Sequence, residues 1–234
     1  MTTRTTVALL LLLCLAPVRS QDMGVQFSVG VASFEMNDLK ILQEHILSTY
    51  PVEGKITSSF PVFTFGEFGV VKQMSPTLRL GGGYGIATTG GKCSYRDYSG
   101  SIVTEIQANS HRLGGYASYS LVDVDWLGFS MYGRAALNIS QIEAFSSLYV
   151  GSLGSTNTDK YRSFSPDLSA GGELLFRLGD VELGLEGGYL FNLSGQLANT
   201  DSRSDLVDPG DPDRVLSADW TGFRAGLKVI VWTR

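Results

Sequence analysis

Near its carboxyl end the chain reads Gly222-Phe-Arg-Ala-Gly-Leu-Lys-Val-Ile-Val231, a run in which the side chains alternate in character. One face carries apolar residues such as Phe223 and Leu227, and the opposite face carries glycines with Arg224 and Lys228. Alternation with a period of two predicts a β-strand whose two faces meet different environments. The run is also long enough for a tilted strand to cross the hydrocarbon core of a bilayer.

The same alternation recurs along most of the chain, and a single segment departs from it. In that segment Met36, Leu39, Leu42 and Ile46 recur at helical spacing, which predicts a helix over 36–48. The alternating segments number eight, and they span 25–34, 60–71, 77–87, 103–121, 126–142, 165–177, 181–193 and 216–233.

The connections between these segments alternate in length. The first connection is long and holds the predicted helix, long polar loops are expected at 88–102, 143–164 and 194–215, and the intervening turns are short. An up-and-down barrel shows this pattern because its turns lie at one end and its loops at the other. The sequence therefore predicts an all-β fold, an eight-stranded antiparallel up-and-down transmembrane β-barrel with a short helix in the first long loop. Both ends of such a barrel lie at its turn end.

Alternation alone leaves open which face points inward. A secreted soluble barrel of the lipocalin type would be apolar inside and bind a small apolar ligand, whereas a membrane barrel would be apolar outside. The chain has 28 glycines, many of them on the polar face. Glycine weakens a water-exposed strand, but a narrow interior needs small residues between large ones. This favours the membrane barrel.

The polar face also carries charges of both signs in nearly equal number, which suits a closed interior because buried charges persist only when they are paired. Aromatic residues near the strand ends, including Trp126 at the turn end and Trp220 at the loop end, are expected to form interfacial belts. The predicted lumenal ion-pair network comprises Glu67, Arg79, Arg112, Arg134, Glu173, Glu182, Glu186, Arg224 and Lys228. The predicted lipid-facing residues include Leu183, Leu185, Phe223, Leu227, Val229 and Val231.

The amino terminus has the features of an export signal. Residues 1–20 hold a basic start, an apolar run too short to span a bilayer, and small residues at Val18 and Ser20, which place cleavage after Ser20. The barrel domain is then 21–234. Cys93 is left as the one cysteine of that domain, so we expect a free thiol in an exposed loop and no internal disulfide.

Three strand segments, Gly81-Gly-Gly-Tyr-Gly85, Gly114-Gly-Tyr-Ala-Ser118 and Gly222-Phe-Arg-Ala-Gly226, give the chain a resemblance to a known family. It resembles the outer membrane protein β-barrel domain family of small OmpA/OmpX-like eight-stranded barrels. The resemblance implies the outer membrane of a Gram-negative-type bacterium, periplasmic termini, and long loops exposed to an extracellular partner. It also implies contact with outer-membrane lipids and the barrel assembly machinery. Such barrels commonly end on an aromatic residue, whereas this chain ends Trp232-Thr-Arg234.

Few residues point to chemistry. The net charge is −5 and no basic cluster occurs, which excludes a nucleic-acid partner. His45 lies in the predicted helix, and His111 lies on the lipid-facing side without a Ser and a carboxylate beside it. The acidic loop at 201–213 lacks the ligand spacing of a Ca²⁺ site. We therefore predict no catalytic, cofactor-binding or metal-binding residues.

These observations favour a non-enzymatic integral outer-membrane barrel with a structural or surface-interaction role. Eight strands leave an interior that side chains fill, so we expect a closed polar lumen without general porin activity. Two alternatives remain, the soluble lipocalin-like barrel and an outer-membrane lipid-modifying enzyme that uses His111.

Overall fold

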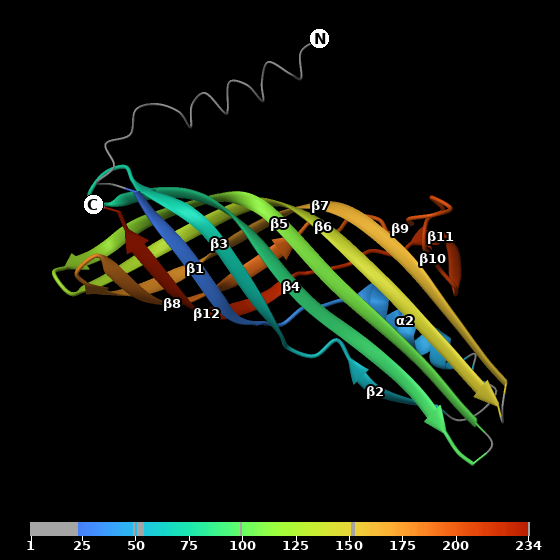
Figure 1. Cartoon of the computed structure of the whole chain (residues 1–234). Helices are drawn as coiled ribbons and strands as arrows, with labels where there is room; N and C mark the ends of the chain where they lie inside the picture. The colour runs from blue at the N-terminus through green and yellow to red at the C-terminus, as the bar shows by residue number, and fades with distance from the viewer. Residues whose placement is uncertain (1–22, 49, 51–53, 99, 151–152, 234) are drawn as a thin grey trace, which may run out of the picture.

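Eight strands close into a ring in which each strand pairs antiparallel with two neighbours (Figure 1). The computed structural model describes residues 23–48, 50, 54–98, 100–150 and 153–233. The predicted signal segment 1–20, with cleavage after Ser20, lies outside the described residues. In ring order the strands are β1 (Met23–Ala32), β3 (Phe63–Gln73), β4 (Leu78–Arg96), β5 (Gly100–Val124), β6 (Leu127–Val150), β7 (Leu153–Leu178), β8 (Val181–Asn192) and β12 (Gly222–Trp232).

This ring confirms the predicted antiparallel up-and-down barrel of eight strands, and the helix lies in the first long connection as expected. β1 and β12 pair from Gly24–Trp232 to Ala32–Arg224, which closes the barrel. No helix in the described part of the chain is long and apolar enough to cross a membrane. The remaining elements lie at the loop end, and they are α2 (Asn37–Ser48), β2 (Lys55–Ser59), β9 (Ala198–Asn199), β10 (Val207–Asp208) and β11 (Asp211–Val215).

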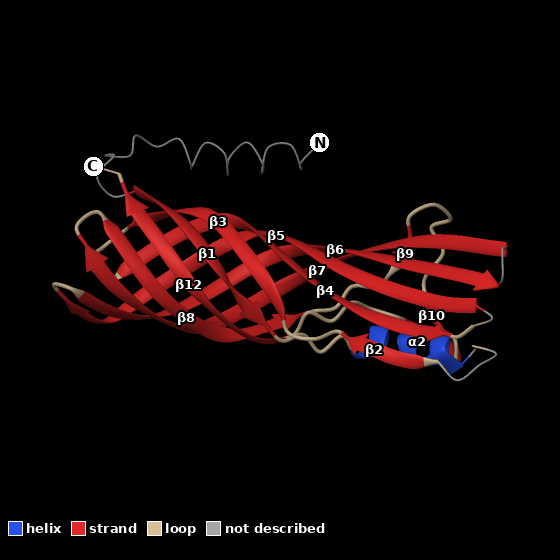
Figure 2. Ribbon diagram, turned by 60° about the horizontal axis from the view of Figure 1, so that its bottom comes forward, coloured by secondary structure: helices blue, strands red, loops and turns tan. Residues whose placement is uncertain are grey.

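Four strands, β4 to β7, continue past the barrel as a sheet, which we call the extension (Figures 1 and 2). The prediction of long polar loops at 88–102 and 143–164 was therefore wrong. β4 pairs with β5 residue by residue from Leu78–Tyr119 to Arg96–Ser101. Polar side chains do not prevent this pairing, because outside a membrane the outward face of a strand is solvated and its charges pair across strands, as Lys92 does with Glu105.

The two faces of these long strands exchange polarity where the barrel ends and the extension begins. In the barrel part of β5, Leu113 and Tyr119 point outward and are exposed, while Arg112 points inward and is buried. In the extension the inward face carries apolar residues such as Ile106 and Ala108, and the outward face carries polar residues such as Glu105 and Gln107. We call the change between the row of His111 and the row of Asn109 the polarity crossover.

The inward face of the extension is covered by α2 and the last long connection, which together form an apolar cap over the barrel mouth (Figure 2). The helical face predicted from spacing is buried there, with Met36 and Leu39 fully enclosed. α2 approaches β4 closely at Gly91, where a Cβ atom would lie 2.8 Å from Nε2 of Gln43. The cap core comprises Ala32, Phe34, Met36, Leu39, Leu42, Phe60, Phe65, Ala87, Ile106, Ala108, Ile142, Leu190, Leu197, Leu216, Ala218 and Trp220.

Cys93 lies under this cap and not in an exposed loop. It belongs to β4, its side chain is buried, and it is a free thiol as expected. The prediction of exposure was wrong because it followed from the loop assignment at 88–102. The inward position of Cys93 in the extension places it beneath α2, where its Sγ contacts the carbonyl oxygen of Gln43.

Candidate functional site

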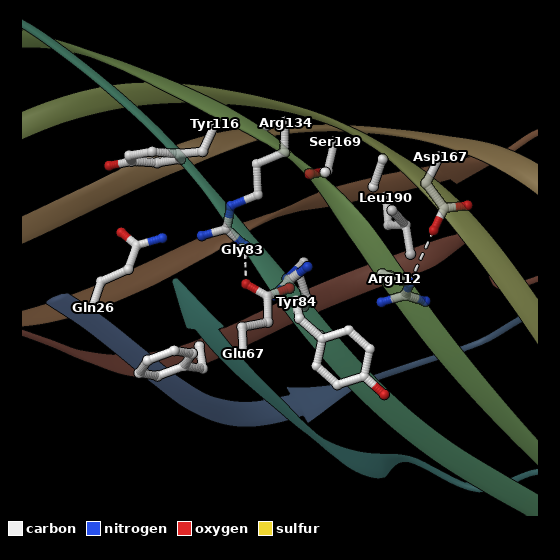
Figure 3. Close-up of a pocket in the computed structure, with 16 residues that line it drawn as sticks. Gln26, Glu67, Gly83, Tyr84, Arg112, Tyr116, Arg134, Asp167, Ser169 and Leu190 are labelled. Carbon is white, nitrogen blue, oxygen red and sulfur yellow. Dashed lines mark hydrogen bonds and ion pairs between the residues drawn. The ribbon is translucent and has the colours of Figure 1, made fainter. Parts of the chain in front are cut away.

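The candidate site is the polar lumen of the barrel, into which the structure brings all nine residues of the predicted ion-pair network. Figure 3 shows part of this network, including Glu67, Arg112 and Arg134. At its centre Glu186 on β8 meets cations from two other strands. Its Oε2 accepts from Nη2 of Arg134 at 2.6 Å and lies 3.1 Å from Nζ of Lys228. Its Oε1 lies 3.6 Å from Nη2 of Arg224. One carboxylate therefore joins three cations from β6 and β12.

Glu67 on β3 completes the centre of the network (Figure 3). Its Oε2 accepts from Nη1 of Arg134 at 2.7 Å, and its Oε1 accepts from Nη2 of Arg224 at 2.6 Å. Each of the two arginines thus contacts both Glu67 and Glu186. Inward pairing of this kind offsets the cost of removing these charges from water.

Toward the turn end the network continues through two further ion pairs. Glu173 on β7 pairs with Lys228 and accepts hydrogen bonds from the hydroxyls of Tyr116 at 2.7 Å and Ser118 at 2.6 Å. Arg79 on β4 donates two hydrogen bonds to Glu182, at 2.7 and 3.0 Å. The second pair is the fork geometry that makes arginine–carboxylate pairs strong.

Toward the loop end, the network includes a residue that the sequence prediction missed. Nε of Arg112 lies 2.9 Å from Oδ2 of Asp167 on β7, and both side chains are buried (Figure 3). In the sequence, Asp167 falls on the same face of its strand as Glu173. This alternation was the signal from which its place in the lumen could have been predicted. With Asp167 included, the five buried cations face five carboxylates, and Arg177 at the turn end, which contacts Glu182, pairs also with Asp123, so the described ion-pair network is balanced in charge.

Aromatic rings and glycines fill the rest of the lumen. The guanidinium carbon of Arg134 lies 4.5 Å from the ring centroid of Tyr132, and Nζ of Lys228 lies 4.7 Å from that of Tyr116. The hydroxyl of Tyr132 fits only because its neighbour is glycine, since a Cβ at Gly188 would lie 2.5 Å from it. The interior glycines therefore make room for large side chains, as the sequence pattern predicted.

A small cavity of about 60 Å³ remains beside the central ion pairs (Figure 3). Its lining includes Gln26, Arg112 and Arg224, each of which has a buried polar atom without a hydrogen-bond partner among the described residues. That volume accommodates roughly four water molecules, which suit such atoms. The lumen is thus polar and largely filled by side chains.

Trp220 separates the lumen from the cap. Its side chain is fully buried, its Nε1 donates to Oγ of Ser140 at 2.8 Å, and its ring packs edge-on against Phe34 at 4.7 Å. The prediction that Trp220 belongs to an exposed aromatic belt was therefore wrong. The residue precedes β12, so its strand parity did not apply, and its apolar ring is buried by the cap. Trp126, also predicted for a belt, is exposed at the turn end.

The outward face of the barrel is apolar. Of the six predicted lipid-facing residues, Leu183, Leu185, Phe223, Leu227 and Val231 are exposed and Val229 is partly exposed. A soluble barrel that binds an apolar ligand needs the opposite arrangement, with an apolar interior cavity. The lipocalin-like alternative is therefore wrong.

The histidine on this face has a neighbour that explains its position. Nδ1 of His111 lies 2.6 Å from the hydroxyl of Tyr84, and its cross-strand partners are Ile86 and Ile139. The pair lies at the polarity crossover, where amphipathic rings are favoured. Within the described residues, no three His, Cys, Asp or Glu side chains gather closely enough to hold a metal ion.

The sequence matches no family model and no curated protein. Among solved structures, the chain is similar to Neisserial surface protein A, with 12% identity over 92% of this chain and 98% of the other and a TM-score of 0.38. It is also similar to the attachment invasion locus protein Ail of Yersinia pestis, with 7% identity, 90% and 98% coverage and a TM-score of 0.34. A major outer membrane protein from Thermus thermophilus has 14% identity, 88% and 99% coverage and a TM-score of 0.44. These identities and TM-scores are low. The barrel is established by the closed ring of strand pairings in this chain.

Proposed function

We propose that the protein is a non-enzymatic integral outer-membrane barrel of a Gram-negative-type bacterium, with a structural or surface-interaction role. The observation that carries the proposal is the arrangement of polarity. An apolar outward band encloses a charge-balanced lumen, and Trp220 with the cap covers that lumen. Eight-stranded barrels filled in this way have no aqueous channel.

Membrane integration is tested by extraction. The protein should stay with the envelope after salt and carbonate washes and need detergent for release. Unboiled samples should run on SDS gels as a compact band that shifts only on heating. Recovery in the soluble periplasm without detergent would contradict the proposal.

The closed lumen is tested by conductance in planar bilayers. Purified protein should give no large, sustained current, because the lumenal side chains are paired and packed. A steady porin-like conductance would overturn this part of the proposal while leaving the membrane location intact.

The proposed orientation puts both barrel termini in the periplasm and the cap outside the cell. β1 and β12 begin and end at the turn end, opposite the cap. Trypsin added to intact cells should then cleave in the last long connection, at the exposed Arg203. Cleavage only after the outer membrane is permeabilised would reverse the orientation. The extension and the cap are the surfaces that an extracellular partner would meet, and the barrel assembly machinery is the proposed route of insertion.

The non-enzymatic assignment is tested at His111, the residue on which a lipid-modifying activity would depend. Its hydrogen bond to Tyr84 accounts for it as an interfacial residue. His111→Ala should therefore leave the envelope lipid composition unchanged. A lipid species lost in the variant and restored by the wild-type chain would assign an enzymatic role.

A further inference from the structure

The outward face of the barrel carries a groove over β5, β6 and β7. Small residues form its floor, among them Gly115, Ala135 and Ala170, and Leu80 and Leu168 stand at its sides. Its volume is about 720 Å³, and it lies within the apolar band. An apolar, elongated occupant such as an acyl chain suits it, because a bilayer supplies such chains at this depth.

The strands that carry the groove end their apolar band in one regular row, and a polar row follows directly. The cross-strand row at the polarity crossover is Ile86, His111, Ile139 and Phe164. The next row toward the cap is Thr88, Asn109, Gln141 and Arg162. The second row therefore lies at the level where lipid headgroups meet the barrel.

Arg162 is the cation of this polar row. It is exposed, and within the described residues it has no carboxylate within 4 Å, whereas Lys92 and Lys160 on the same face pair with Glu105 and Glu143. Gln141 lies opposite Arg162 on β6. A guanidinium beside a side-chain amide offers several N–H donors in the fork geometry that matches phosphate oxygens.

A second outward groove has an acidic residue beside it. It lies over β8, β12 and β1, has a volume of about 630 Å³, and is lined by Ser33, Tyr189 and Phe223 among others. The residue beside its polar end is Glu35, which accepts from the hydroxyl of Tyr189 at 3.5 Å. An anionic headgroup is therefore disfavoured on that side and favoured on the side of Arg162.

We propose that the β5–β7 face is a binding site for an anionic, phosphate-bearing membrane lipid, with the phosphate at Arg162 and Gln141 and an acyl chain descending toward the groove. This proposal rests on the proposed membrane location. It adds that the protein selects lipids by their headgroup. Annular lipids that only coat the barrel would show no preference for a headgroup. A site with a cation at headgroup level holds an anionic lipid in preference to a zwitterionic one.

The test uses the purified full chain in phosphatidylcholine vesicles with a small amount of spin-labelled phosphatidic acid or spin-labelled phosphatidylcholine. Electron spin resonance gives the fraction of each lipid immobilised by the protein. The wild-type chain should prefer the phosphatidic acid roughly fivefold, the effect expected for one cation near a membrane surface. Arg162→Gln should remove the preference, and Arg96→Gln, the same change at an exposed position farther from the barrel, should keep it.

Ala135→Leu provides a second variant, because it fills the groove floor from the lipid side without touching the lumen. It should lower the immobilised fraction of the phosphatidic acid while the heat-shifted gel band stays unchanged. Equal preference in the wild-type chain and in Arg162→Gln, or no preference in the wild-type chain, would overturn the site. If neither lipid is immobilised and the gel band does not shift with heat, the protein is not inserted and the proposed function itself fails.

Discussion

The guanidinium carbon of Arg112 lies 5.7 Å from the ring centroid of Trp220, so the last cation of the lumen lies against the first large ring of the cap. On one side of this contact Arg112 pairs with Asp167, and on the other Trp220 packs against Phe34. The contact joins a polar interior to an apolar one.

Removing the indole should open the cap. Trp220→Ala deletes a fully buried side chain, which costs about 3–5 kcal/mol in well-packed cores. We expect faster tryptic cleavage at Arg203 and Arg214 in the last connection, with the heat-shifted barrel band retained. Trp220→Phe keeps most of the packing and loses the hydrogen bond to Ser140. Its rate of tryptic cleavage should therefore lie between those of the wild-type chain and Trp220→Ala. Loss of the barrel band in Trp220→Ala would show that the cap and the barrel fold as one unit.

Glu186 should be the most sensitive carboxylate of the lumen. Glu186→Gln leaves Arg134, Arg224 and Lys228 with one less negative charge in a buried site. Breaking a buried pair costs about 3–5 kcal/mol, which should appear as a lower urea midpoint in vesicles. The matched change Glu105→Gln removes an exposed partner of Lys92 and should cost less than about 1 kcal/mol. Equal effects of the two changes would contradict a tightly coupled lumen.

Gly91 should be required for docking of α2. In Gly91→Ala the new methyl group lies within 2.8 Å of the Gln43 side chain, which donates to the carbonyl oxygen of Ser58 at 2.6 Å. Overpacking of this kind costs about 1–3 kcal/mol, and we expect faster proteolysis within the first long connection. Gly133→Ala serves as the control, because its nearest contact is 4.0 Å away on the outward face. Similar proteolysis of the two variants would argue against the close approach.

Cys93 should react slowly with alkylating reagents. Burial raises the pKa of the Cys93 thiol above its ordinary value and also restricts access. We expect slow labelling by iodoacetamide at pH 8, and labelling more than about tenfold faster in Cys93→Ala/Ser94→Cys, where the thiol points outward. Fast labelling of the wild-type chain would indicate that the cap opens readily.

The same pKa shift gives stability a pH dependence of known sign. The folded state holds the Cys93 proton more tightly than the unfolded chain, so its contribution is fully present below the ordinary thiol pKa of about 8.5. The contribution is lost as pH rises from there toward the higher pKa of the folded state. Urea titrations across this range should show a decline that Cys93→Ala lessens.

Period-two alternation was sufficient to predict the strands, their order and the inward side of residues such as Glu186 and Arg134. It worked in the barrel because membrane and lumen impose opposite polarities on the two faces. Asp167 was on the correct face but was not recognised as a partner, because pairing depends on the shear of the barrel, which brings Arg112 on β5 to Asp167 on β7. The shear cannot be deduced from the spacing of these residues in the sequence.

The extension and the cap could not be predicted from the same rule. Beyond the polarity crossover, Lys92 faces outward and Cys93 inward, the reverse of the barrel, so the polar stretch 88–102 was interpreted as a loop. The burial of Trp220 and Cys93 depends on α2 and the last connection folding back over the sheet. Such contacts are set by tertiary packing, and local pattern does not contain them.

The polarity crossover has a mechanical consequence for a barrel in a bilayer. If the molecule moved outward by one cross-strand row, Ile139 and its neighbours would enter water, and if it moved inward by one row, Asn109 and Gln141 would enter hydrocarbon. Both displacements cost free energy. The reversal of polarity therefore fixes the depth at which the barrel is inserted in the bilayer. Because the inward and outward faces of β4 to β7 exchange polarity at this row, these four strands hold the cap at a constant height above the membrane surface.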